Sequence, residues 1–189
     1  MGKDNRFLVL YHGALTTGRG IETLIKQVSF NDLIYGVILG DGEINYVEFL
    51  HALAEKYSVS DRVLFHPAVP ISDLYKYVGA VDLCLMMIQG KVKSYYYSLP
   101  NKFFESIQSL TPIVASDFPE MKRIIDYYQI GLTCNPNDSN AIKAAVNKMR
   151  TDNEFYNKCK INLIRAKNEM CWEKEKVVLV NCFERLLVD

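Results

Sequence analysis

The chain has 189 residues, of which 49% are hydrophobic and 23% are charged, and these values fit one globular domain with a substantial core. Lysine plus arginine and aspartate plus glutamate both number 22, so no net charge favours nucleic acid or an anionic membrane as a partner, and any anion site has to be local. Five scattered cysteines without a Cys-x-x-Cys pair indicate reduced thiols, and three dispersed histidines give no metal-ligand spacing.

Short apolar runs alternate with longer segments of helical period, which predicts an α/β fold with a doubly wound, Rossmann-like parallel sheet of about six strands and helices on both faces. Strands are expected at Phe7–Tyr11, Ile34–Leu39, Val63–Phe65, Leu83–Met87, Ile113–Ala115 and Gly131–Cys134. Helices are expected at Gly20–Val28, Asn45–Tyr57, Ser72–Val78, Asn101–Leu110, Met121–Tyr127 and Ser139–Met149.

The last part of the chain carries no strand signal. From Asp152 onward the pattern predicts two helices divided near Cys171 and Trp172, and Val177, Val180, Phe183 and Leu187 would form the apolar stripe of the second. We therefore predict a single domain over residues 1–189, with a Rossmann-like core at 1–151 and a helical C-terminal extension at 152–189.

The loops that follow the strands are where a ligand is expected, because open parallel sheets bind ligands at the carboxyl ends of their strands. The first loop contains Gly13, Gly18, Arg19 and Gly20. Glycines allow a close approach to phosphate, and Arg19 stands at the mouth of a helix. The loop lacks the Lys-Ser/Thr of a P-loop and the Gly-x-Gly-x-x-Gly of a dinucleotide site, so a plain glycine-rich turn is the alternative.

Two further loops are weaker candidates. Gly40 begins a Gly-Asp-Gly-Glu turn in which Asp41 and Glu43 could equally cap the next helix. His66 opens a His-Pro-Ala-Val-Pro stretch whose prolines enforce an extended path, either to face the edge of a base or as a rigid connector.

A fourth candidate is SYYYSLPNKFFE, residues 94–105. Pro100 suits a first helical turn, and Asn101, Lys102 and Glu105 then share one helix face. Lys102 and the helix N-terminus would favour a diphosphate, while Glu105 could accept hydrogen bonds from a sugar diol. The alternative is an exposed Lys102–Glu105 pair worth a few tenths of a kcal/mol.

Five segments resemble, in order and spacing, the C-terminal, nucleotide-sugar-binding domain of GT-B glycosyltransferases, especially the large retaining family with a Glu-x7-Glu motif. They are YHGALTTGRGIETLI, VILGDGE, DRVLFHPAVPISDLYKYVGAVDLCLM, SLPNKFFESIQSLTPIVASDFPEM and CWEKEKVVLVNCFERL. The resemblance implies that Arg19 meets the donor diphosphate and that Glu105, the second motif glutamate, binds the ribose. Tyr97 stands where the first motif glutamate would meet the donor sugar, and Ala14 stands where many members carry an arginine. The residues expected to bind the nucleotide sugar are Gly13, Arg19, Gly40, His66, Leu99, Pro100, Asn101, Lys102 and Glu105.

The resemblance also implies a function and partners. The chain would be the donor half of a glycosyltransferase that transfers a sugar from a UDP- or GDP-sugar to a saccharide or lipid-linked acceptor, with no metal, other cofactor or nucleic acid. The acceptor domain and the catalytic side chain would lie on an N-terminal domain absent from this sequence, so the chain would be a fragment or one subunit of a split enzyme, with little activity alone. A cytoplasmic protein, able to associate with the inner face of a membrane, is expected. The alternative is a non-catalytic nucleotide- or partner-binding Rossmann-like module.

Overall fold

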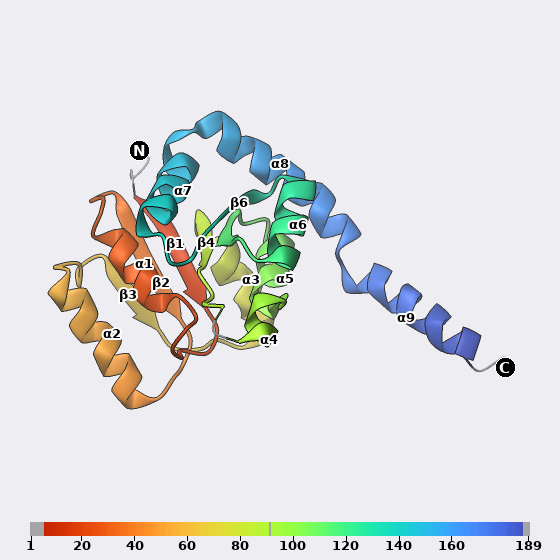
Figure 1. The fold of residues 1–189 in the computed structure, drawn as a ribbon, viewed down its shortest axis with the longest axis horizontal. Helices are drawn as coiled ribbons and strands as arrows, with labels where there is room; N and C mark the ends of the chain where they lie inside the picture. The colour runs from red at the N-terminus through yellow and green to blue at the C-terminus, as the bar shows by residue number, and fades with distance from the viewer. Residues whose placement is uncertain (1–5, 91, 187–189) are drawn as a thin grey trace.

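A parallel sheet of six strands forms the centre of the molecule in the computed structural model, which describes residues 6–90 and 92–186 (Figure 1). The strand order is β3-β2-β1-β4-β5-β6, and each neighbouring pair is parallel. This topology confirms the doubly wound sheet predicted from the sequence. The strands are β1 (Phe7–His12), β2 (Ile34–Leu39), β3 (Val63–His66), β4 (Leu83–Met86), β5 (Ile113–Ser116) and β6 (Gly131–Cys134).

Helices cover both faces of the sheet, because successive side chains of each strand point to opposite sides. Val9 packs in the core cluster on one face, whereas the next residue, Leu10, packs in the cluster on the other. The first face is covered by α1 (Ile21–Val28), α2 (Ile44–Lys56) and α7 (Ser139–Thr151). The second is covered by α3 (Ile71–Gly79), α5 (Asn101–Gln108) and α6 (Pro119–Tyr128).

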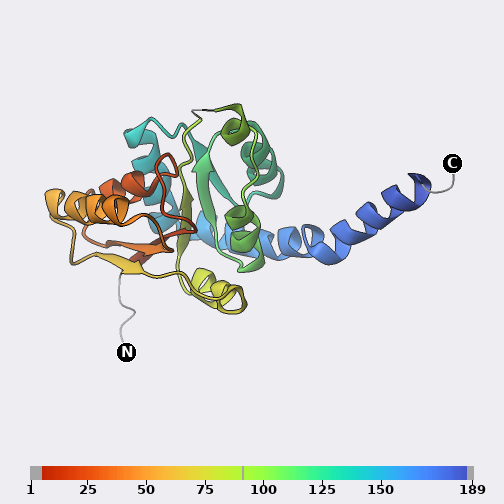
Figure 2. The same ribbon diagram turned by 90° about the horizontal axis from the view of Figure 1, so that it is seen from below.

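The C-terminal extension consists of two helices with different surroundings. Helix α8 (Asn153–Glu169) joins the two core clusters, since Cys159 packs in one and Leu163 in the other. Helix α9 (Trp172–Leu186) has no buried residue and projects away from the domain in both views (Figures 1 and 2). The division near Trp172 was predicted, and the predicted residue Leu187 lies outside the described residues. No described helix has the length and apolar character needed to cross a membrane.

Three local predictions differ from the structure. The one-turn helix α4 (Lys93–Tyr96) was not predicted, because four residues carry no measurable period. Pro100 is extended, with ψ of 150°, and precedes the first residue of α5 instead of lying in its first turn. Asp41 does not cap α2, since its Oδ1 accepts a hydrogen bond from the backbone N–H of Ala68 at 3.2 Å and so ties two loops together.

Gly40 fixes the path of the chain where β2 ends. Its φ is 151°, and a Cβ at this position would overlap with the carbonyl oxygen of Gly13. The backbone N–H of Gly13 donates to Leu39 at 3.0 Å, so the ends of β1 and β2 are held in close contact. A glycine is therefore required at position 40 by both conformation and space.

The close approach at Gly40 predicts a large effect of substitution. Gly40→Ala is expected to lower the free energy of unfolding by about 2–4 kcal/mol, because the new methyl group must displace the backbone of Gly13. Gly79→Ala is the matched control, since its Cβ would meet nothing closer than the Ser109 carbonyl oxygen at 3.4 Å. Urea unfolding followed by circular dichroism measures both, and equal costs for the two variants would contradict the packing argument.

Candidate functional site

The sheet changes its winding direction between β1 and β4, and this places a crevice at their carboxyl ends. From β1 the chain continues to β2 and β3 on one side, whereas β4, β5 and β6 lie on the other. The connections that leave β1 and β4 therefore diverge, which is where open α/β sheets bind ligands. The loop after β1 and the start of α5, which follows β4, form the two walls of this crevice.

Backbone hydrogen bonds hold the loop after β1 in a defined shape. The N–H of Leu15 donates to the carbonyl of Asp41 at 2.9 Å, and the carbonyl of Gly18 accepts from Gln89 at 2.9 Å. Gly20 begins α1 with φ of 86°, and a Cβ there would lie 2.7 Å from the Cβ of Met87. The glycines therefore let the loop pass directly over the end of β4.

A cavity of about 430 Å³ lies between this loop and the start of α5. The loop side contributes Gly13 and Arg19, and the helix side contributes residues 99–102 and Glu105. The structure thus brings together residues from two of the loops singled out in the sequence. The N-terminus of α5 adds free backbone N–H groups and a partial positive charge to this cavity.

Lys102 is the most unusual side chain of this cavity. It is 9% exposed, its Nζ has no hydrogen-bond partner, and Nζ lies 3.8 Å from the centre of the Tyr11 ring. The pKa of Lys102 is lowered from 10.5 to about 7, chiefly by burial and also by the nearby positive charge of Arg19, while Glu105 opposes the change. A buried, unpaired ammonium group at a cavity wall is suited to an anionic ligand.

Arg19 is held in a similar way, by an aromatic ring. Its guanidinium carbon lies 4.5 Å from the centre of the Tyr95 ring. Within residues 6–90 and 92–186, none of the ion pairs involves Arg19 or Lys102. Neither side chain therefore forms an ion pair that a ligand would have to break.

Glu105 is oriented by a residue that the sequence did not indicate as a partner. His12 is the last residue of β1 and is 2% exposed, and its Nε2 lies 3.0 Å from Oε2 of Glu105. The two residues are 93 positions apart, so no local spacing links them. The position of His12 directly before Gly13, at the end of a buried strand, was the available signal. This hydrogen bond fixes the Glu105 carboxylate through Oε2. Among residues 6–90 and 92–186, Oε1 has no hydrogen bond, so it can accept one from a ligand hydroxyl.

A second cavity, of about 300 Å³, meets the first at Glu105. His12, Gly13, Ala14 and Glu105 line both cavities. The remaining wall of the second cavity is formed by Gly40 and neighbouring residues after β2 and by Ala68, Val69 and Leu74 from the loop after β3 and the helix α3. The second cavity therefore has mainly apolar and backbone walls, whereas the first carries both cations.

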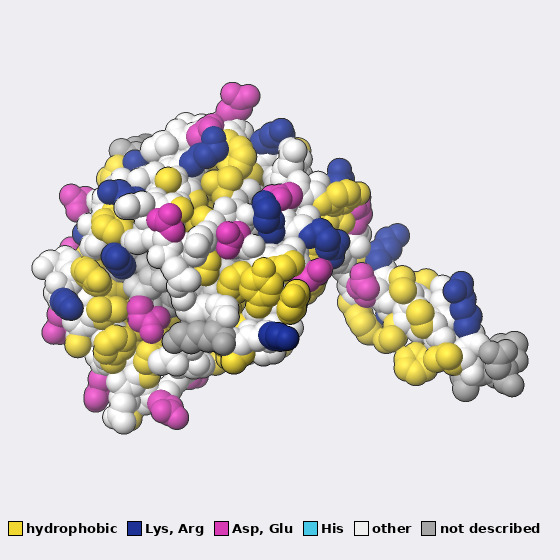
Figure 3. Space-filling model, viewed as in Figure 1, with side chains coloured by type: hydrophobic (Ala, Val, Ile, Leu, Met, Phe, Trp, Pro, Cys, Tyr) yellow, Lys and Arg dark blue, Asp and Glu magenta, His cyan; other side chains and the backbone are white. Residues whose placement is uncertain are grey.

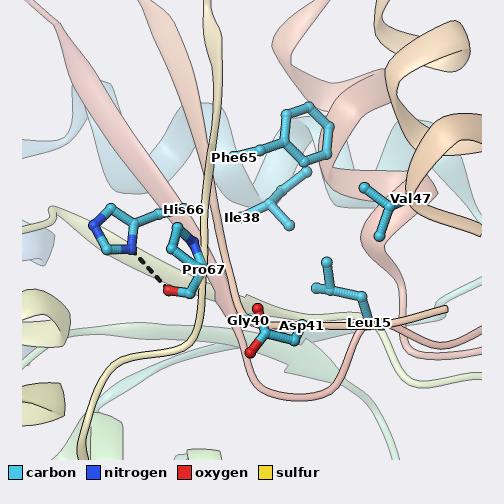
Figure 4. A pocket seen from close by; sticks show the side chains of 9 residues that line it. Leu15, Ile38, Gly40, Asp41, Val47, Phe65, His66 and Pro67 are labelled. Carbon is cyan, nitrogen blue, oxygen red and sulfur yellow. Dashed lines mark hydrogen bonds between the residues drawn. The ribbon is translucent and has the colours of Figure 1, made fainter. Parts of the chain in front are cut away.

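His66 and Tyr97 do not join these residues. A third cavity, of about 260 Å³, has Phe65 on its apolar wall, and the imidazole of His66 points away from that wall (Figure 4). Its Nδ1 donates to the carbonyl of Pro67 at 2.8 Å. Tyr97 is 60% exposed, packs edge-on against Tyr96 and does not line the first cavity. The His66 and Tyr97 side chains thus line neither of the cavities that meet at Glu105, whereas Ala68 and Val69, from the stretch predicted to face the base, line the second.

The described residues also bear on metal binding. Over residues 6–90 and 92–186, no group of three or more His, Cys, Asp or Glu side chains is arranged to hold a metal ion.

Comparison with known proteins identifies the family. The model of the family described as "Glycosyl transferases group 1" matches residues 2–165, and the chain therefore belongs to this family. It is 29% identical over 148 residues to the lipopolysaccharide core biosynthesis glycosyltransferase LpsE of Rhizobium meliloti (strain 1021). This match covers 78% of the chain and 41% of LpsE.

Solved structures share the fold. Sucrose-phosphate synthase (tll1590) from Thermosynechococcus elongatus matches with a TM-score of 0.85 and 21% identity, over 97% of this chain and 46% of the synthase. Anabaena Alr3699/HepE in complex with UDP matches with a TM-score of 0.81 and 16% identity, over 94% of this chain and 49% of HepE. The chain thus spans about half the length of these proteins or less.

The burial of Lys102 predicts a pH-dependent cost in stability. Its pKa is lower in the folded chain than the ordinary 10.5, so the cost is complete below pH 7 and vanishes as the pH rises from 7 towards 10.5. Lys102→Met is therefore expected to raise the free energy of unfolding of the ligand-free chain by about 1–3 kcal/mol at pH 6, and by less at pH 9. Lys76→Met, at an exposed lysine, should show no such difference. A loss of stability in Lys102→Met that is the same at both pH values would contradict this account.

Proposed function

We propose that this chain binds the nucleotide part of a nucleotide sugar, as the donor half of a glycosyltransferase. The observation that carries the proposal is the meeting of two unlike cavities at Glu105. One has two cations and a helix N-terminus, which suit a diphosphate. The other has mainly apolar and backbone walls, which suit a base, and the carboxylate between them suits ribose hydroxyls.

The same arrangement would also serve the chemistry of transfer. When the bond to the sugar breaks, negative charge develops on the departing diphosphate. Arg19, Lys102 and the backbone N–H groups at the start of α5 would stabilise that charge. Stabilisation of this kind requires no metal ion in principle, so we propose a reaction without a metal or other cofactor.

The names of the relatives indicate which donors and acceptors to examine first. Anabaena Alr3699/HepE has been crystallised with UDP and with UDP-glucose, which supports a uridine diphosphate sugar as a donor for this chain. LpsE is named for lipopolysaccharide core biosynthesis, which supports a saccharide or lipid-linked acceptor. A cytoplasmic location, with access to the inner face of a membrane, agrees with such an acceptor.

We propose further that an N-terminal domain completes the enzyme. The relatives of this chain are about twice as long as it is. In addition, α9 exposes apolar side chains that a second domain could cover (Figure 3). These side chains are Trp172, Val177, Val178, Leu179, Val180, Phe183 and Leu186. The acceptor site and the side chain nearest the reacting carbon would lie on that domain.

Ligand-induced thermal stabilisation tests donor binding. UDP, GDP, ADP, their sugars and NAD would each be added to the purified chain. At about 100 times its dissociation constant, a bound nucleotide adds roughly 2.7 kcal/mol to the free energy of unfolding. We expect one nucleoside diphosphate and its sugar to raise the melting temperature and NAD to leave it unchanged.

The role of Glu105 is tested with the same measurement. Glu105→Ala is expected to abolish the ligand-induced shift, because it removes the acceptor for the ribose hydroxyls. The shift is taken within each variant, so any loss of stability from an unpaired His12 does not affect the comparison. Glu48→Ala, at an exposed glutamate of α2, should keep the full shift. No response to any nucleotide would refute the donor site. Nucleotide binding without any sugar transfer, once the proposed N-terminal domain is supplied, would favour the non-catalytic module.

A further inference from the structure

The cations of the first cavity have an unusual set of neighbours. Three groups from other elements lie near Lys102. They are the Tyr11 ring of β1, Arg19 of the loop after β1 and the buried thiol of Cys84 of β4. The acidic group that faces Lys102 is Glu105 on its own helix, and that carboxylate is hydrogen-bonded to His12. Ring faces therefore replace the carboxylates that usually hold a buried cation.

An aromatic ring and a carboxylate affect a bound cation differently. The negative face of a ring attracts a cation, but the ring carries no net charge and does not neutralise it. A carboxylate would form an ion pair that an incoming anion has to break. The rings of Tyr11 and Tyr95 thus hold Lys102 and Arg19 at the cavity wall without neutralising either charge.

This arrangement leaves the charge of Lys102 poorly stabilised while the cavity is empty. Its Nζ is buried and makes no hydrogen bond, and the positive charge of Arg19 acts against it. These conditions favour the neutral amine, so both forms are populated near neutral pH. A diphosphate would supply the missing negative charge and hydrogen-bond acceptors at the same time.

We infer that Tyr11 and Tyr95 are positioning residues for a cation pair that binds the donor diphosphate, and that Lys102 takes up a proton when the diphosphate enters. The inference rests on the proposed function and names how the same site is regulated. The proton comes from solvent and forms one new N–H bond on the lone pair of Nζ, and no other covalent bond changes. Donor binding then weakens as the pH rises above neutrality.

The affinity for UDP-glucose between pH 6 and 8.5 tests the proton coupling. UDP-glucose is the suitable probe because both ends of its diphosphate are esterified, so the ligand does not titrate in this range; the GDP- or ADP-sugar selected by the thermal panel would replace it if needed. The dissociation constant of the unmodified chain is expected to be nearly constant below pH 6.5 and to rise up to about tenfold per pH unit near pH 8. Lys102→Arg, whose guanidinium stays charged, should bind with little pH dependence. Because this variant retains His12, it also separates an effect of Lys102 from one of His12.

Calorimetry of the unmodified chain gives a second readout that needs no variant. Measured at pH 8 in two buffers with different ionisation enthalpies, binding should take up a large fraction of a proton per ligand, and at pH 6 much less. The absence of proton uptake at pH 8 would overturn the coupling. If the unmodified chain and Lys102→Arg bind UDP-glucose with the same pH dependence, the proton coupling is also wrong while the donor site stands. If no nucleotide sugar binds at any pH, the donor site itself is refuted.

Variants of Tyr95 test the positioning role, because this ring is only partly buried. Tyr95→Leu is expected to raise the dissociation constant by roughly 3- to 10-fold through loss of the ring below Arg19. Tyr95→Phe keeps the ring face and should restore most of that loss. Equal weakening in both variants would show that the hydroxyl or the local fold matters instead of the ring, and would overturn the positioning role.

Discussion

The buried charge of Lys102 is the feature on which the rest of the site depends. The lysine stands at the first turn of α5, below the carboxyl end of β1, because the winding of the sheet reverses between β1 and β4. Keeping an ammonium group there without a hydrogen bond costs stability in the empty domain. A cost of this kind is retained most readily where a ligand offsets it, and the same cavity contains Arg19 and a helix N-terminus.

A hydrogen bond between side chains links the two halves of the sheet at the carboxyl ends of the strands. His12 belongs to the strand that leads to β2, while Glu105 belongs to the helix that follows β4. Their contact fixes the carboxylate between a positively charged cavity and a mainly apolar one. The division matches the two chemical parts of a nucleotide, a charged diphosphate and an uncharged nucleoside. Gly13 and Gly40 allow the strand ends to approach closely enough to form both cavities.

Much of the fold could be predicted from the sequence because its signals are local. The strands β2 and β6 have the predicted bounds, since short runs between breakers define them directly. The partnership of His12 and Glu105 could not be predicted, because it depends on how distant segments pack. Successive side chains of β3 point to opposite faces of the sheet, so the imidazole of His66 lies on the face opposite Phe65 (Figure 4). Tyr97 follows a one-turn helix that carries no periodic signal.

The most direct test of the central claim is a crystal structure of this chain with the nucleotide sugar that stabilises it. The account predicts phosphate oxygens within hydrogen-bond distance of Lys102 Nζ and of the Arg19 guanidinium, with the ribose hydroxyls on the Glu105 carboxylate. The base should then lie against Ala68 and Val69. A nucleotide bound elsewhere on the domain, or a diphosphate that leaves Lys102 without a contact, would contradict it.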